Sequence, residues 1–493
     1  MNARHQPEAD ITPSAVVVGG GIAGLTAAHD LRQHGFTVTI LEASPHFGGC
    51  VTSHEVAGLT LDAGADSFST RSKAVADLAA ELGLWQDIVY PAQRGAWLQL
   101  PGSDPGASAQ PLPSTGILGI PANPREPDVV RAIGNAAAVR AALDKVMPLG
   151  SLVKRDRVSL AEVVQERMGD QVLKRLVTPI AAGVFSSDPS VLDVDVVAPG
   201  LRAAMAKHGS LGAAVASIRA DAPAGSAVGG LAGGMNRLTT ALIDTLRGGG
   251  VRLLADTRVT GIRESGESSG ARWAVLSDGA EFTADVLVMA TDGPTAVGLL
   301  GESVLQLKEE TPTPGAGVAL VTLVVDLPEL DVNPRGTGVL VAPGVKAQNG
   351  SPVVAKALTH ATAKWQWLSE TTGPGGHVLR LSYGRAEPQG EDRPEMWSDE
   401  KLYEQALADA GVLLGIRIGA EDVVGWDVVR WIGALPAAAV GHRDRVARIR
   451  ASVASENGLE VVGAWLSGTG LAAVIGDTRA RMRKLAHAHP PTA

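Results

Sequence analysis

The first strong pattern along the chain is a short apolar run followed by a helical one. Residues 16–18 are three valines, a β-branched run typical of a buried parallel strand. Residues 22–34 then follow helical spacing, and Gly35 is placed to end the helix. A second apolar run, 38–41, ends in an acid, Glu42. The pattern predicts one strand–helix–strand unit.

Three glycines between the first predicted strand and the helix have the spacing G-x-G-x-x-G. Gly19 allows a tight turn, Gly21 lets the backbone approach a pyrophosphate, and Gly24 lets the helix pack against the strand. The partial positive charge of the helix N-terminus favours an anion there. Glu42 lies 18 residues after Gly24, close to the spacing of about 20 expected for an acid that binds ribose hydroxyls. The unit predicts adenine dinucleotide binding; the alternative is a glycine-rich turn in an ordinary βαβ unit.

The rest of the chain alternates between helical and strand patterns. An amphipathic helix is expected over 72–85, loops over 101–126, mostly helices over 127–220 and a small-residue linker over 221–234. Further helices are predicted at 235–247, 399–414 and 471–485. Strands are predicted at 251–254, 272–277, 285–291 and 459–465, and an antiparallel sheet is predicted around 316–325 and 376–383.

This order of elements predicts an α/β fold with α+β inserts. A Rossmann-like dinucleotide domain would be discontinuous, built from 14–90, 225–300 and 425–493. A mainly helical insert would span 91–224, and an antiparallel-sheet substrate domain would span 301–424. Nicotinamide dehydrogenases usually have a contiguous cofactor domain, whereas FAD oxidases often thread a substrate domain through theirs. The layout therefore favours FAD.

Composition narrows the possible partners. The 493 residues are 45% hydrophobic with a net charge of −9, which argues against nucleic acid and against an anionic membrane surface. Cys50 is the only cysteine, so no internal disulfide can form, and a reducing, cytoplasmic compartment is expected. The sequence predicts no signal peptide and no transmembrane segment, and peripheral membrane contact stays open.

Several segments in order resemble the FAD-dependent amine-oxidase-like flavoproteins and, within them, the protoporphyrinogen and coproporphyrinogen oxidases of heme synthesis. The high-GC Gram-positive type of coproporphyrinogen oxidase is the most similar, through the residues 465–470. The segments that carry the resemblance are 19–24 with 42–44, Phe47-Gly48-Gly49, 61–68, Gly233-Gly234-Met235, 257–259, 357–359 with Lys364-Trp365, 379–385, 434–436 with 440–442, and Gly468-Thr469-Gly470-Leu471.

The resemblance implies FAD as cofactor and a set of residues that bind it. These are Gly19, Gly20, Gly21, Ile22, Ala23, Gly24, Glu42, Ala43, Gly49, Cys50, Gly64, Ala65, Asp66, Ser67, Val259, Trp431, Gly470, Leu471, Ala472 and Ala473. Two positions depart from the family pattern. Cys50 stands where Lys or Arg usually follows the glycine pair, and Ser467 stands where Arg is common.

The implied reaction is the six-electron oxidation of coproporphyrinogen III to coproporphyrin III in three flavin cycles, with molecular oxygen reduced to hydrogen peroxide. The flavin carries the chemistry, so no catalytic side chain is assigned, and no metal-ligand spacing is found. The amides of 471–473, at a predicted helix N-terminus, are expected to stabilise negative charge on the reduced flavin. The alternative for these residues is an ordinary capped helix.

Two cations are candidates for substrate binding. Arg71 follows the Asp66-Ser67-Phe68 turn and could reach a propionate, or it could be an exposed arginine at a helix start. Lys364 could lie near the flavin or on a strand surface. Trp431 could pack beside the flavin or fill a core, and Asp66 could accept from the cofactor or stabilise its own turn.

Other functions remain open at this point. They are protoporphyrinogen IX oxidase, another amine-oxidase-like FAD oxidase, and a binding protein of the same fold without cofactor. A transient contact with the next enzyme of heme synthesis is also possible.

Overall fold

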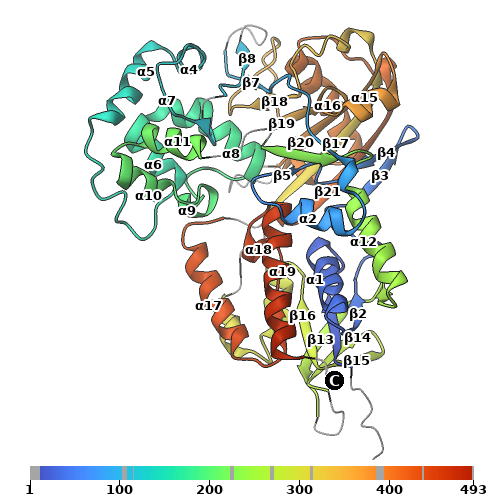
Figure 1. The fold of residues 1–493 in the computed structure, drawn as a ribbon. Coiled ribbons are helices and arrows are strands. Elements are labelled where there is room, and N and C mark those ends of the chain that lie inside the picture. The colour runs from blue at the N-terminus through green and yellow to red at the C-terminus, as the bar shows by residue number, and fades with distance from the viewer. Residues whose placement is uncertain are drawn as a thin grey trace, which may run out of the picture.

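The computed structural model describes residues 12–102, 108–114, 116–221, 227–266, 271–310, 312, 315–384, 393–435 and 438–490. Figure 1 shows three regions: a parallel sheet with its helices at the bottom, a helical region at the upper left and a large mixed sheet at the upper right.

The parallel sheet has five strands in the order β12-β2-β1-β16-β22, and every neighbouring pair is parallel. Its strands are β12 (Arg252–Leu254), β2 (Thr37–Leu41), β1 (Ser14–Val18), β16 (Val286–Met289) and β22 (Leu459–Val461). Neighbours in this sheet come from all three sequence pieces predicted for the dinucleotide domain. The Rossmann-like fold class and its discontinuous sheet are therefore confirmed.

Helices and a smaller sheet cover the two faces of the parallel sheet. One core joins it to α1 (Ile22–Gln33), α2 (Ala74–Glu81), α12 (Asn236–Gly248) and α19 (Leu471–Ala488). The other core joins it to an antiparallel sheet of β13 (Val259–Glu264), β14 (Trp273–Ser277) and β15 (Ala280–Ala284), and to α13 (Gly293–Leu300), α17 (His442–Ala454) and α18 (Ala464–Ser467). Burial on both faces explains why β1 and β16 read as unbroken apolar runs.

The large sheet has seven strands in the order β21-β17-β20-β19-β18-β7-β8. They are β21 (Val423–Leu435), β17 (Ala316–Asp326), β20 (Gly376–Tyr383), β19 (Ala357–His360), β18 (Gly338–Val341), β7 (Trp97–Gln99) and β8 (Ala109–Pro111). All neighbours are antiparallel except β18 and β7. One face packs on α16 (Asp399–Leu414), while α14 (Ala361–Lys364) and α15 (Gln366–Thr372) follow β19.

Three sequence expectations differ from this arrangement. β8 lies in the stretch 101–126 that was expected to be loop, and β7 lies just before it in a stretch without a predicted strand, because strands of three residues are too short to show a clear alternation. β11 (Val228–Leu231) lies within the expected linker and pairs with β5 (Phe68–Ser69) and β6 (Ile88–Val89). Hydrogen bonds to these two strands stabilise β11 although two of its four residues are glycines, which disfavour strands. β21, most of it in the range predicted for the dinucleotide domain, belongs to the large sheet. The exact domain boundaries stay a prediction.

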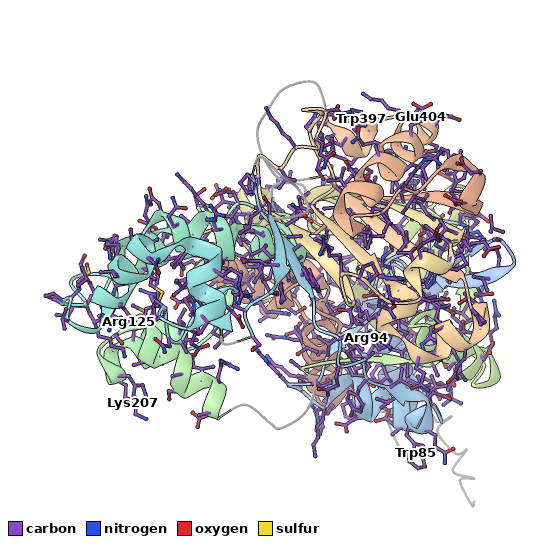
Figure 2. The ribbon with its side chains drawn as sticks, turned by 90° about the horizontal axis from the view of Figure 1, so that it is seen from above. Trp85, Arg94, Arg125, Lys207, Trp397 and Glu404 are labelled. Atoms are coloured by element: carbon purple, nitrogen blue, oxygen red, sulfur yellow. The ribbon has the colours of Figure 1, made fainter. Side chains whose placement is uncertain are left out.

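The remaining region is helical, as expected for 127–220. It contains α4 (Pro127–Ile133), α5 (Asn135–Ala142), α6 (Leu160–Met168), α7 (Asp170–Val172), α8 (Thr178–Phe185), α9 (Val194–Val197), α10 (Leu201–His208) and α11 (Leu211–Ala220). A buried ion pair ties these helices together: Arg167 Nε donates to Asp144 Oδ1 at 2.6 Å, and the amide of Gly212 donates to Asp144 Oδ2 at 2.8 Å. Seen from above, Arg125 and Lys207 lie in this region, across the molecule from Trp397 and Glu404 (Figure 2).

Two short hairpins complete the described elements: β3 (Ser53–Val56) with β4 (Leu59–Asp62), and β9 (Gly116–Ile117) with β10 (Ile120–Pro121). In the part of the chain that the structure describes, no helix is both long enough and apolar enough to cross a membrane.

Candidate cofactor site

The glycine turn after β1 is built as the sequence predicts. Gly19 has a φ of +105°, and a Cβ on it would lie 2.8 Å from the carbonyl oxygen of Ala290. A Cβ on Gly24 would lie only 1.9 Å from the carbonyl oxygen of Gly19. Gly24 therefore lets α1 start directly against the end of β1, with Ile22 and Ala23 buried in its first turn.

Glu42, at the end of β2, faces the same turn. One carboxylate oxygen accepts from the amide of Gly20 at 2.6 Å, and the other accepts from the amide of Ser44 at 2.8 Å. Each carboxylate oxygen has a second lone pair, so the group keeps acceptor capacity for ribose hydroxyls.

A cavity of about 240 Å³ opens beside this carboxylate. The predicted residues that line it are Gly19, Gly21, Glu42, Ala43 and Val259. Thr257 and Arg258 line it as well, together with residues 290–292 that follow β16. The cavity lies at the carboxyl ends of β1, β2 and β16, which is where open α/β sheets bind ligands. These residues fit the ADP half of FAD.

The second glycine pair packs directly on the glycine turn. The amide of Gly48 donates to the carbonyl oxygen of Gly20 at 2.8 Å, and Gly49 lies against Gly21. Cys50 follows and is exposed, and its carbonyl oxygen accepts from the amide of Ala65 at 2.9 Å. This bond connects the first predicted cofactor segment with the second.

The second segment, the 63–67 turn, comes between β4 and β5. Asp66 accepts a hydrogen bond from Lys364 Nζ at 2.8 Å, forms an ion pair with Arg380 at 3.2 Å, and accepts from Ser67 Oγ at 2.9 Å. Burial opposes ionisation of Asp66, but the two cations outweigh it and hold the pKa of its carboxyl well below the usual range. Asp66 is therefore ionised at neutral pH.

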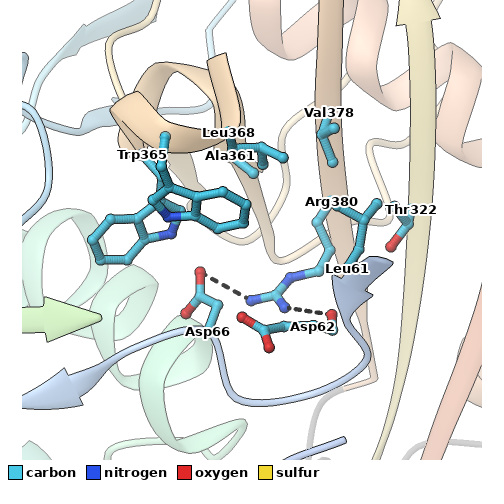
Figure 3. A pocket seen from close by; sticks show the side chains of 10 residues that line it. Leu61, Asp62, Asp66, Thr322, Ala361, Trp365, Leu368, Val378 and Arg380 are labelled. Atoms are coloured by element: carbon cyan, nitrogen blue, oxygen red, sulfur yellow. Dashed lines mark hydrogen bonds and ion pairs between the residues drawn. The ribbon is translucent and has the colours of Figure 1, made fainter. Parts of the chain in front are cut away.

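Two more side chains hold this turn from outside it. The Trp431 indole N–H on β21 donates to the carbonyl oxygen of Ala63 at 2.8 Å, and Arg380 on β20 donates to that of Gly64 at 2.9 Å. Figure 3 shows Arg380 between Asp66 and Asp62, with Trp365 above them. Trp431 thus contacts the predicted cofactor turn itself and does more than fill a core.

Asp62 connects the same turn to α12. Its carboxylate accepts from the amides of Met235 at 2.9 Å and Asn236 at 3.0 Å, which caps the start of that helix. Burial raises the pKa of Asp62, while these amide bonds act against the shift. The sequence prediction missed both Asp62 and Arg380. The one sequence signal for Arg380 was its position as a charged residue inside an otherwise mostly apolar strand.

The C-terminal segment supplies a helix N-terminus. α19 begins at Leu471 after Gly470, and no side chain caps it. Among the described residues, the amides of Leu471 and Ala472 have no acceptor, whereas that of Ala473 donates to the carbonyl oxygen of Gly470 at 3.0 Å. Two of the three predicted amides are therefore available for an anion, and the third is used within the helix start.

The two substrate candidates lie in different surroundings. Lys364 is partly buried on α14 with its ammonium on Asp66, whereas Arg71 is exposed just before α2. Among the described residues, no hydrogen bond or ion pair joins the Arg71 side chain to Asp66, Lys364 or Arg380. His360 is buried against His377, with Nε2 of the first 3.0 Å from Nδ1 of the second, and burial lowers the pKa of His360 to about 3. It is therefore a structural, neutral histidine.

Ser467, one of the two positions that depart from the family pattern, is bonded within its own helix. Ser467 donates to the carbonyl oxygen of Gly463 at 3.0 Å and lies in α18, before the Gly468–Gly470 loop. Across the described ranges, no cluster of three or more His, Cys, Asp or Glu residues is placed to hold a metal ion. Of the resemblance segments, residue 385 and part of 434–436 lie outside the described residues or their described side chains.

Comparison with known proteins supports the same cofactor. Residues 22–477 match the family of flavin containing amine oxidoreductases. The chain is 30% identical to the coproporphyrinogen III oxidase of Mycobacterium leprae (strain TN), a match that covers 94% of this chain and 96% of the relative. It is 26% identical to the enzyme of the same name from Bacillus subtilis (strain 168), over 92% of this chain and 94% of the relative.

A solved structure agrees over nearly the whole chain. It is a protein from Exiguobacterium sp. 255-15 described as a candidate protoporphyrinogen oxidase, with a TM-score of 0.80 and 25% identity, covering 96% of this chain and 99% of that one. The predicted family and the predicted cofactor, FAD, are confirmed. The chain belongs to the family of flavin-containing amine oxidoreductases.

Proposed function

We propose that this enzyme oxidises coproporphyrinogen III to coproporphyrin III. The observation that carries the proposal is the 30% identity to the Mycobacterium leprae coproporphyrinogen III oxidase over almost the full length of both chains. The reaction removes six electrons and six protons from the macrocycle in three two-electron steps. Three molecules of oxygen become three of hydrogen peroxide, so atoms and electrons balance.

FAD, when bound, supplies the two-electron acceptor for each step. In this proposal Glu42 and the turn 19–24 hold the ADP half, through ribose hydroxyls and a pyrophosphate at the start of α1. The proposal assigns the 63–67 turn and the start of α19 to the flavin end. The amides of Leu471 and Ala472 would donate hydrogen bonds to negative charge on the reduced flavin, because no described group accepts from them in the chain itself.

Substrate carboxylates need cations at the entrance to the site. Arg71 is the stronger candidate, because its guanidinium is exposed and suits a propionate bidentately. Lys364 would first have to exchange Asp66 for the substrate. We expect Arg71→Ala to raise KM for coproporphyrinogen III with kcat nearly unchanged.

Protoporphyrinogen IX is the second candidate substrate, favoured by the description of the Exiguobacterium structure. The deciding experiment compares initial rates of the FAD-loaded enzyme on the two porphyrinogens, with oxygen uptake and peroxide formation followed together. The proposal expects a higher kcat/KM on coproporphyrinogen III and three peroxides for each porphyrin. A clear preference for protoporphyrinogen IX would overturn it in favour of the second candidate.

Oxygen is the proposed oxidant, and product transfer would involve a transient contact with the next enzyme of heme synthesis. The lone cysteine fits a cytoplasmic enzyme, with or without peripheral membrane contact. A purified sample that shows no flavin absorbance even after FAD is added would favour a cofactor-free binding protein instead.

A further inference from the structure

One side chain of the large sheet touches the predicted flavin turn at several atoms. Arg380 extends from β20, and its Nη1 donates to the carbonyl oxygens of Gly64 at 2.9 Å and Asp62 at 3.4 Å. Its Nη2 lies 3.2 Å from Asp66 Oδ2. A single guanidinium therefore binds both the backbone and the carboxylate of the turn (Figure 3).

The geometry of these contacts needs an arginine. The guanidinium is planar, with donors in a fixed fork, so it can serve a carbonyl and a carboxylate at once. A lysine at position 380 would keep the charge but could not hold the same set of acceptors in one orientation. The Arg380 side chain is only 16% exposed, so solvent cannot easily replace the lost bonds.

The charge balance around Asp66 points to a second consequence. Lys364, Arg380 and Asp66 together carry a net charge of +1, and the nearby Asp62 carboxylate is engaged by the amides at the start of α12. Loss of Arg380 would leave a neutral Lys364–Asp66 pair. An anion beside the turn would then lose an attractive charge in a partly buried site.

We propose that Arg380 is a positioning residue for the flavin reaction: it holds the 63–67 turn against the cofactor and contributes one positive charge beside it. The inference goes beyond the proposed function and depends on it only through the placement of the flavin at this turn. Arg380 would act through the turn and through Lys364, without touching the substrate.

The test compares Arg380→Lys and Arg380→Gln with a matched control, Arg202→Lys. Arg202 in the helical region is similarly buried, at 14% exposure, and also binds one carboxylate, Asp195, and two backbone carbonyls, those of Leu152 and Arg155. The measurements are FAD content, the flavin visible spectrum, the flavin reduction potential, kcat and KM, and the melting temperature.

We expect both Arg380 variants to lower kcat by roughly tenfold or more, with a smaller change in KM. Arg380→Gln should shift the reduction potential to a more negative value, because the charge is lost, while Arg380→Lys should keep most of the potential but alter the flavin spectrum. Arg202→Lys should lower only the melting temperature. Arg380→Lys is the milder variant, so it still provides the spectral and kinetic tests if Arg380→Gln does not fold.

Unchanged spectrum, potential and kcat in a folded Arg380 variant would overturn the proposal and leave Arg380 a structural arginine like Arg202. A wild-type chain that binds FAD but does not oxidise coproporphyrinogen III would contradict the proposed function alone, because the spectrum and potential still report on Arg380. A wild-type chain that binds no flavin would contradict both.

Discussion

The two ends of the proposed cofactor site are built in different ways. At the proposed adenosine end, close contacts between backbone segments and one local acid make the site, with Gly19, Gly24 and Glu42 all within one βαβ unit. At the proposed flavin end, side chains from another sheet hold the 63–67 turn, and Lys364 and Gly64 have partners about 300 residues away in sequence. The first end depends on glycines that let backbone segments approach each other closely. The second end depends on ion pairs and hydrogen bonds between segments that are distant in sequence. Each should therefore fail in its own way when it is mutated.

The largest expected effect is at the backbone end. Gly24→Ala would place a Cβ 1.9 Å from the carbonyl oxygen of Gly19, so α1 must move away from β1. We expect a loss of ~3 kcal/mol or more in the free energy of unfolding, together with loss of FAD binding. Urea unfolding and flavin content measure both.

The matched control is Gly298→Ala in α13, where an added Cβ meets no atom within 4 Å. This helical glycine should tolerate alanine or gain about 0.5–1 kcal/mol. Equal destabilisation by the two substitutions would show that the close approach at Gly24 is unimportant.

The next effect is at the side-chain end. Asp66→Asn would leave Lys364 and Arg380 facing each other without their shared carboxylate, at a cost of about 3 kcal/mol. Because the folded-state pKa of Asp66 is depressed, its contribution to stability is present above the pKa of the unfolded chain and is lost as pH falls through the folded pKa.

The difference in urea midpoint between wild type and Asp66→Asn should therefore be largest near neutral pH and shrink below about pH 4. A difference that does not depend on pH would mean that the ionised carboxylate is not what holds the turn.

A smaller effect is expected at the ribose end. Glu42→Gln replaces a charged acceptor by a neutral one, so the apoprotein should bind FAD roughly tenfold to a hundredfold more weakly, with little change in the flavin spectrum. Fluorescence titration with FAD measures the affinity. Glu302→Gln, at an exposed glutamate outside the site, should leave it unchanged.

The smallest effect concerns one hydrogen bond. Trp431→Phe removes the indole N–H that donates to the carbonyl oxygen of Ala63, while most of the aromatic packing stays. We expect a loss of about 1 kcal/mol in unfolding free energy and a small spectral change. A large loss of FAD affinity in this variant would mean that Trp431 contacts the cofactor directly. Side chains at the flavin end would then bind the cofactor themselves, as Glu42 is proposed to do at the other end.

The same contrast explains what the sequence could predict. The turn at 19–24 and Glu42 could be predicted because strand, glycines and acid follow one another within a few turns of chain. In the large sheet, β17 and β20 were predicted as strands, whereas β21 was not, and β7 and β8 are too short to show alternation. Arg380 was missed because an arginine in a strand pattern usually points to solvent, and its acceptors belong to residues 62–66.

The strand order has a consequence for how the protein is made. β1 and β2 leave the ribosome early, but β22 and α19, which complete the sheet and cover α1, follow roughly 400 residues later. At about 5–20 residues per second, that interval is on the order of 20–80 s. Until then the sheet lacks its edge strand β22, and α1 lacks the helix α19 that covers it. Cofactor capture therefore belongs to the last stage of synthesis, and nascent chains need protection of the apolar β1 and α1 surfaces until then.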